Sequence, residues 1–113
     1  MHEMALAESV LQLVEETARR EGARRVKTVV LEIGALSSVE PEALRFCFDV
    51  VIRDSLAADA ALEIVAVPGA GWCLDCAATV PMSERFAACP KCSGHALNPT
   101  SGTEMRVREI EID

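Results

Sequence analysis

Two pairs of cysteines constrain the fold of this chain more than any other feature of its sequence. Each pair encloses two residues, from Cys73 to Cys76 and from Cys89 to Cys92, and residues 77–88 separate the pairs. Paired cysteines at this spacing are typical of a tetrahedral site with four thiolate ligands, whose usual occupant is Zn2+. We therefore expect a zinc site, with a short hairpin in 77–88 that brings the two pairs together.

This zinc site is expected to be structural. A tetrahedron filled by four thiolates leaves no position for a bound water, so Lewis-acid catalysis is not expected at the metal. Iron in a rubredoxin-like centre would use the same ligands, but zinc is the commoner occupant of an isolated ribbon. His95, three residues after Cys92, could approach the metal only if a thiolate left, and we expect it to be exposed or to cap a hairpin.

The cysteines belong to a segment, 69–102, whose composition differs from that of the rest of the chain. It contains Trp72, three of the five prolines and four of the six glycines, but few large apolar side chains. A segment this small needs metal binding to supply its folding free energy. We expect a zinc-binding lobe over 69–102, inserted into a body formed by residues 1–68 and 103–113.

Two helices are predicted in the body. Apolar residues recur at helical spacing over 4–21, and Gly22 follows as a stop signal. Pro41 suits the first position of a second helix, whose apolar stripe continues over 44–56. Cys47 lies on this stripe, so we expect a buried thiol rather than a nucleophile.

Three strands complete the body. Alternating apolar and β-branched residues predict strands over 25–33, 62–67 and 105–112. The apolar parity changes in the last of these, so we expect a bulge or an exchange of faces near Arg108 and Glu109. The predicted fold class is α+β, with a three-stranded sheet packed by two helices and an inserted zinc-ribbon lobe.

Charge and hydropathy bear on partners and location. The chain has 18 acidic and 11 basic residues, a net charge of -7, so nucleic acid is a poor first candidate for a partner. The segment 69–102 is neutral, and its only basic residues are Arg85 and Lys91. No apolar run approaches the ~20 residues of a membrane span, and the start of the sequence lacks the basic region of a signal peptide. We expect a cytoplasmic protein that does not bind membranes.

His2 gives the N-terminus the elements of a second metal site. If Met1 is retained, its amine, the His2 amide nitrogen and the His2 imidazole can close adjacent chelate rings around one ion. Ni(II) and Cu(II) prefer such a nitrogen-rich, planar ligand set. The carboxylate or amide of Glu3 can add a further donor. The alternative is that His2 is an ordinary solvent-exposed residue at a frayed end.

These features together resemble the HypA/HybF family of hydrogenase-maturation nickel metallochaperones. The resemblance spans the chain: Met1-His2-Glu3-Met4 opens a helix, and the cysteine motif precedes the last strand. Further matching segments are Val30-Leu31-Glu32-Ile33-Gly34, Val39-Glu40, Phe46-Cys47-Phe48-Asp49 and Glu104-Met105-Arg106-Val107.

The resemblance implies specific site residues. His2 is the implied nickel ligand, supported by main-chain nitrogens of residues 1–3 and by Glu3. Glu40 matches an acidic position near that site, although Glu3 and Glu40 are also explained as ordinary carboxylates at helix N-termini. Zinc is the implied ion at the four cysteines.

The resemblance also implies partners. Family members deliver nickel with the GTPase HypB to the large subunit of [NiFe] hydrogenase, and in some organisms they also serve urease. We expect a monomer or a weak dimer.

The leading hypothesis is a non-enzymatic nickel carrier. The sequence has no P-loop, so nucleotide energy would have to come from a partner. The rival from another class is a zinc-ribbon adaptor for protein or nucleic-acid interaction. A redox or hydrolytic enzyme is a third reading, in which one cysteine pair acts as a dithiol, but two matched pairs favour a shared metal.

Overall fold

The computed structural model describes residues 2–113 and forms two compact units. The first unit runs to Leu31 and adds Val39–Val65 and Val107–Asp113, and the second comprises Glu32–Ser38 and Ala66–Arg106. The elements of the described residues, in chain order, are α1 (Glu3–Arg20), β1 (Val26–Gly34), α2 (Pro41–Val51), β2 (Ala61–Val67), β3 (Gly69–Cys73), β4 (Ala78–Met82), β5 (Leu97–Ser101) and β6 (Met105–Ile112).

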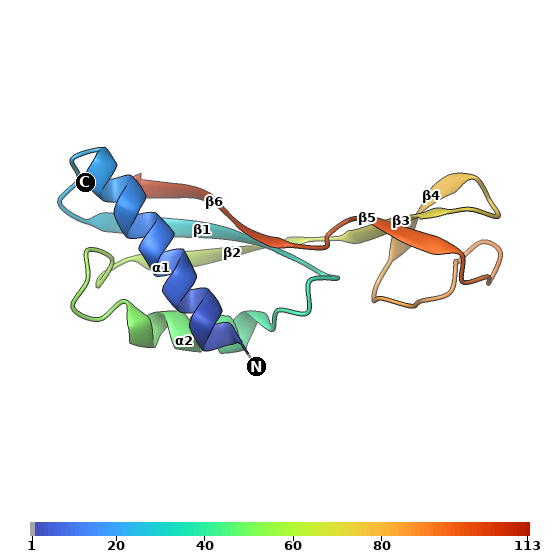
Figure 1. Ribbon diagram of the computed structural model, residues 1–113, viewed down its shortest axis with the longest axis horizontal. Coiled ribbons are helices and arrows are strands. Elements are labelled where there is room, and N and C mark those ends of the chain that lie inside the picture. The colour runs from blue at the N-terminus through green and yellow to red at the C-terminus, as the bar shows by residue number, and fades with distance from the viewer. Residues whose placement is uncertain (1) are drawn as a thin grey trace. The chain divides into compact units, whose positions relative to one another are not determined.

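One sheet has the strand order β2-β1-β6, and α1 packs against α2 (Figure 1). Side chains of β1 alternate along the strand: Val29, Leu31 and Ile33 are buried, whereas Thr28 and Val30 are only half-buried. This alternation is that of a sheet covered on one face. The predicted α+β fold is confirmed.

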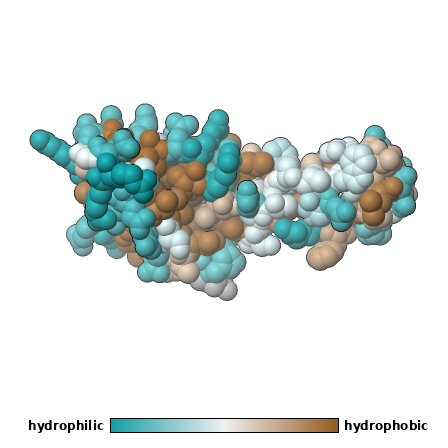
Figure 2. All heavy atoms as spheres, turned by 45° about the horizontal axis from the view of Figure 1, so that its top comes forward, coloured by the Kyte–Doolittle hydropathy of each residue, from teal (hydrophilic) through white to brown (hydrophobic). Residues whose placement is uncertain are grey.

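The first helix buries the stripe that its sequence predicts. Ala7, Val10, Val14 and Ala18 are buried, one or two turns apart, while Met4 and Leu13 at the edges of the stripe are exposed. Figure 2 shows hydrophilic side chains over much of the visible surface of this unit, with hydrophobic ones gathered between them.

The helix ends at Arg20, and Gly22 follows as the predicted stop signal. The φ angle of Gly22 is 72°, in the left-handed region that glycine tolerates best. The N–H of Gly22 bonds to the carbonyl of Arg19, and that of Ala23 bonds to the carbonyl of Ala18. This pair of bonds is a Schellman motif, which satisfies the last carbonyl groups of α1.

The second helix is shorter than predicted. It ends at Val51, and turns follow over residues 52–59, so the expectation of helix to Leu56 is wrong. The Ser55 hydroxyl donates to the carbonyl of Ile52 at 2.6 Å and accepts from the N–H of Ala57 at 3.0 Å. These local bonds compete with helix continuation, although the apolar spacing persists.

Cys47 is half-buried, and the expectation of a buried thiol is wrong. The buried line of α2 runs through Leu44 and Phe48, and Cys47 lies at its edge beside Phe46, whose side chain is 69% exposed. Periodicity places a residue on an apolar stripe without showing how far the neighbouring elements cover it.

The exchange of faces predicted in the last strand is present in β6. Met105 and Val107 are half-buried, Arg108 and Glu109 are both exposed, and the half-buried positions resume at Ile110. The exposure parity therefore changes at the two residues that the sequence indicates.

A second sheet, with strand order β4-β3-β5, lies within the second unit. β3 pairs antiparallel with both neighbours, with Cys73 opposite Ala78 on one side and Leu97 on the other. The hairpin expected within 77–88 is displaced: β3 and β4 form it, and its turn is the first cysteine pair. The strands carry glycine, proline and polar residues, so periodicity alone does not reveal them.

Two glycines allow backbones to approach closely in the second unit. A Cβ atom on Gly34 would overlap the carbonyl of Gly102, and one on Gly102 would lie 2.6 Å from the carbonyl oxygen of Pro68. Gly102 also has a φ of 74° and accepts a hydrogen bond from the N–H of Leu36 at 2.7 Å. Residues 34–36 are thereby joined to the segment before β6.

Candidate metal centres

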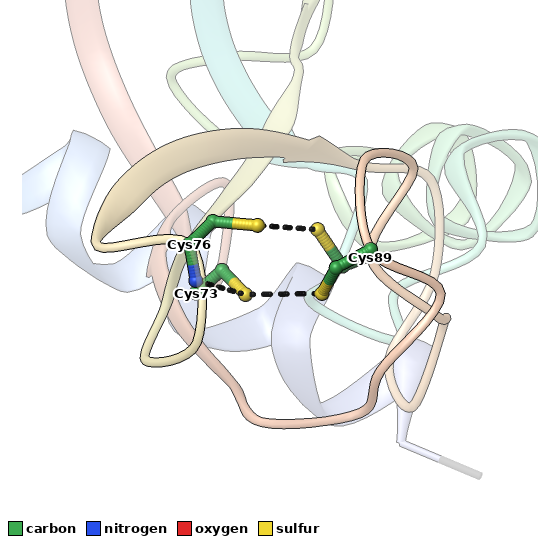
Figure 3. Close-up of side chains that lie close together, drawn as sticks. Cys73, Cys76 and Cys89 are labelled. Carbon is green, nitrogen blue, oxygen red and sulfur yellow. Dashed lines mark hydrogen bonds between the residues drawn. The ribbon is translucent and has the colours of Figure 1, made fainter.

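The four paired cysteines form one cluster in the second unit. Their sulfur atoms all lie within 4.8 Å of one another. The sulfurs of Cys73 and Cys92 are 3.7 Å apart. Those of Cys76 and Cys89, labelled in Figure 3, are 3.9 Å apart. A tetrahedral zinc ion with Zn–S bonds of ~2.3 Å separates its ligand sulfurs by about 3.8 Å. Two of the sulfur–sulfur distances therefore match the spacing in a zinc site, and the other sulfurs lie close enough to share one ion.

The two pairs of cysteines share two features of the backbone. The residue after the second cysteine has a positive φ, 51° at Ala77 and 63° at Ser93. Main-chain N–H groups turn towards sulfur, that of Cys76 to Cys73 and that of Lys91 to Cys89, each at 3.4 Å. Such donors favour the thiolate form, which is the form that binds metal.

The cluster also forms the small apolar core of its surroundings. Cys73 and Cys89 are buried with Val80, and Cys76 and Leu97 pack against them. Cys92 is exposed, so the site opens towards solvent on that side. Because it contains so few apolar side chains, this core needs a bound metal ion to hold its sulfur atoms together.

The thiols differ in acidity because they share protons and main-chain donors. The backbone N–H of Cys92 lowers the pKa of the Cys89 thiol to about 7, whereas hydrogen bonding with the Cys92 side chain raises the pKa of Cys76 to about 12. Adjacent thiolates repel one another, so a cation is needed to hold all four deprotonated. A divalent ion that prefers thiolate ligands, such as Zn2+, suits this donor set.

His95 does not belong to the cluster. Its side chain is exposed, and it is absent from the group of clustered ligand atoms in the described residues. The structure thus agrees with the expectation of an exposed histidine.

A second group of candidate ligands lies in the first unit, at the start of α1. His2 is 52% exposed, and its Nε2 lies 4.0 Å from Oε2 of Glu3, whose side chain is only 16% exposed. The same Glu3 oxygen accepts a hydrogen bond of 3.4 Å from the main-chain N–H of Glu40. The structure therefore brings His2, Glu3 and the backbone of Glu40 together. Met1, the other candidate here, lies outside the described residues.

The Glu40 carboxylate has a structural task of its own. Its Oε2 accepts from the N–H groups of Glu42 at 2.8 Å and Ala43 at 3.2 Å, so it caps the first turn of α2. Pro41, at the first helical position, needs no such partner because it has no N–H. The contact between Glu3 and Glu40 runs through the main chain of Glu40.

The charge of Glu3 is favoured by this surrounding. The N–H of Glu40 is the main cause that lowers the pKa of the Glu3 carboxyl, with smaller contributions from main-chain N–H groups at the start of α1 and from His2. The first N–H groups of a helix have no acceptor within it, and His2 supplies no side-chain cap to α1. The Glu3 carboxylate partly replaces such a cap, because the main-chain N–H groups of His2 and Glu3 contribute to its lowered pKa.

Comparison with known proteins identifies the family. The family model described as "Hydrogenase/urease nickel incorporation, metallochaperone, hypA" matches residues 1–112. The chain belongs to the HypA family. The hydrogenase maturation factor HypA of Dechloromonas aromatica (strain RCB) is 70% identical over 113 residues, which is 100% of both chains. That of Azoarcus sp. (strain BH72) is 59% identical over 112 residues, or 99% of this chain and 98% of the relative.

Solved HypA structures share this fold. The solution structure of the Ni metallochaperone HypA from Helicobacter pylori has a TM-score of 0.69 at 29% identity, and the match covers 99% of this chain and 97% of that one. A second solution structure, of a HypA protein, has a TM-score of 0.68 at 31% identity and covers 99% and 96%. Within residues 2–113, no helix combines the length and apolar composition that a membrane span requires.

Sequence reasoning missed the contacts that organise both candidate sites. The main-chain donors to Cys73 and Cys89 follow from the spacing of each pair and could have been expected. The family resemblance places Glu40 near the N-terminal site, but no sequence signal shows that its main-chain N–H donates to Glu3, because this contact depends on how α1 and α2 pack.

Proposed function

We propose that this HypA-family protein is a nickel metallochaperone, which binds Ni(II) at its N-terminus and delivers it during maturation of [NiFe] hydrogenase. The observation that carries the proposal is the position of His2, exposed at the start of α1 and beside Glu3, which is hydrogen-bonded to Glu40. The family description, which names nickel incorporation, supports the same cargo.

The proposed ligands are mainly nitrogen atoms. The His2 imidazole and amide nitrogen combine with the amine of Met1, if Met1 is the terminal residue. The amides at the start of α1 can give up their protons without breaking helical hydrogen bonds, because the first turn has none to break. Glu3 is proposed as a supporting carboxylate at the nickel site. Glu40 is proposed to support the site through its main-chain N–H, which donates to Glu3, because its carboxylate caps α2.

Release of nickel is favoured by the same position. A site at a chain terminus involves few packed side chains, and His2 is more than half exposed. Few contacts must therefore break when the ion is passed on.

The second metal is proposed to be structural. Cys73, Cys76, Cys89 and Cys92 would hold Zn2+, which supplies folding free energy to a zinc-binding lobe over 69–102, while residues 1–68 and 103–113 form the nickel-binding body. No water position remains beside four thiolates, so we propose no enzymatic activity at this metal.

The remaining assignments follow from the family. We propose that the protein acts in the cytoplasm with HypB and the large subunit of [NiFe] hydrogenase, as a monomer or weak dimer. The family description also covers urease, so urease maturation proteins are possible recipients. Nucleic acid and membranes are not proposed as partners.

Calorimetric titration with Ni(II) tests the proposal. Zinc-loaded protein without tags should bind nickel stoichiometrically, His2→Ala should abolish binding, and the matched control His95→Ala should leave it unchanged. Elemental analysis should find the same zinc content in all three. Binding retained in His2→Ala would contradict the N-terminal nickel site. No nickel binding by the wild type, or nickel that displaces zinc, would favour a zinc-ribbon adaptor.

A further inference from the structure

A group of basic residues follows α1 in the first unit. Residues 19–27 contain five of the chain's eleven basic residues, although the net charge of the chain is -7. The Schellman motif at Gly22 reverses the chain directly after the helix. Only residues 21–25 therefore connect the last turn of α1 to the start of β1. We name this group the basic cluster: Arg19, Arg20, Arg24, Arg25 and Lys27, all exposed.

Neighbouring acids neutralise only part of the basic cluster. Arg19 pairs with Glu15 at 3.6 Å, and Arg25 pairs with Asp113 at 2.9 Å. Glu21 is the one acidic residue within 19–27. Within the basic cluster, the cations that form no ion pair with any residue from 2 to 113 are Arg20, Arg24 and Lys27.

A small hollow adjoins these cations. Its volume is about 140 Å³, and its lining residues are Arg24, Arg25, Val26, Ser55, Leu56, Ala58 and Asp59. Because Arg25 is already paired, Arg24 is the guanidinium there that can receive another carboxylate. The hollow has room for an acidic side chain.

We propose that the basic cluster is a docking surface for an acidic segment of a protein partner. A guanidinium binds a carboxylate through two parallel hydrogen bonds, so Arg24 would hold one acidic side chain at the hollow. Arg20 and Lys27 would contact neighbouring acidic residues. Charge complementarity selects a short acidic stretch, because a long nucleic-acid backbone would also meet the acidic remainder of this chain.

The docking surface is separate from the proposed nickel site. The two lie at opposite ends of α1, which has 18 residues and therefore a length of ~27 Å. A partner bound at the basic cluster leaves His2 accessible, so the surface can hold a recipient or an accessory protein while nickel is transferred. The inference does not depend on nickel binding and can fail or succeed independently of it.

The test is a nuclear magnetic resonance titration of isotopically labelled, zinc-loaded protein with an octaglutamate peptide. Amide shifts should concentrate at residues 19–27 and 55–59 and should weaken as salt is added. The variant Arg20→Gln/Arg24→Gln/Lys27→Gln should bind about tenfold more weakly, because three exposed ion pairs are removed. Lys91→Gln, which removes an exposed cation of the second unit, should bind as the wild type does.

Several results would overturn the proposal. One is a set of amide shifts spread over all the basic residues. Another is an equal loss of peptide affinity in the triple variant and in Lys91→Gln, and a third is the absence of saturable peptide binding. Tighter binding of a single-stranded oligodeoxynucleotide of equal charge would assign the surface to nucleic acid instead. Nickel stoichiometry measured on the triple variant should be unchanged, which separates this inference from the nickel site.

Discussion

The main-chain N–H of Glu40 donates a hydrogen bond of 3.4 Å to Oε2 of Glu3, and so joins residues 37 positions apart. Through it the first turn of α1 is held beside the residue whose carboxylate caps α2. Since His2 directly precedes Glu3, this contact also sets the surroundings of the proposed nickel ligand. The two helix starts should therefore respond together to changes at Glu3.

Substitution of Glu3 should change how stability depends on pH. The pKa of the Glu3 carboxyl is lowered from its usual 4.5, so its stabilising effect is complete above that value and is lost as the pH falls through the lowered pKa. In urea unfolding at pH 7, Glu3→Gln should be less stable than the wild type, and Glu3→Ala, which removes the acceptor, less stable again. At strongly acidic pH the wild type and Glu3→Gln should converge; an unchanged difference there would contradict the role of the charge.

Removal of the metal should unfold the cysteine cluster while the helices persist. When a chelator removes the metal, Val80 and Leu97 are the apolar side chains left packed among the thiols. They cannot replace the ~10–16 kcal/mol that a structural zinc ion contributes to folding. Cys92→Ser should lose zinc, and Cys47→Ser, which alters the cysteine outside the cluster, should keep it. Elemental analysis with far-ultraviolet circular dichroism measures both effects. Loss of zinc in Cys47→Ser would show that the cluster is not the site.

Two glycine substitutions should differ in cost although both residues have positive φ. Gly22→Ala meets no atom within 4 Å and should cost ~1 kcal/mol of unfolding free energy, the price of the left-handed backbone alone. Gly102→Ala adds overlap with the Pro68 carbonyl and should cost about 3 kcal/mol or prevent folding. Denaturant midpoints compare them, and equal midpoints would refute the close approach.

Two phenylalanines on α2 form a matched pair. Phe48 is fully buried, so Phe48→Ala should cost about 3–5 kcal/mol by leaving a cavity. Phe46 is 69% exposed, so Phe46→Ala should change stability by no more than about 0.5 kcal/mol. Thermal or urea unfolding measures the stability of both variants. A large loss of stability in Phe46→Ala would mean that the exposed surface of Phe46 is covered by another copy of the chain.

An N-terminal extension should weaken nickel binding, because the amine of Met1 would become an amide. A C-terminal tag should have no effect on the same titration. Equal nickel affinity of the two tagged proteins would exclude the amine as a ligand and favour a site made of side chains only.

Local sequence patterns anticipated the elements whose residues repeat regularly. The stripe of α1, its stop at Gly22 and the parity change in β6 were all predictable, because the period of apolar residues reports local geometry. The boundary of α2 was not, since Ser55 forms a turn where the apolar spacing continues. The strands β3, β4 and β5 were also missed, because their glycine, proline and polar residues show no regular apolar alternation.

The sequence by itself determined the fold class, the grouping of the four cysteines by spacing, and His2 as a candidate ligand next to the first helix. Only the tertiary structure decided that Glu3 meets the backbone of Glu40, that the Glu40 carboxylate caps α2, and that Cys47 is half-buried. The reason is physical. Periodicity and short motifs act between neighbours in the chain, whereas contacts between distant residues exist only once the packing of helices and strands has set their positions.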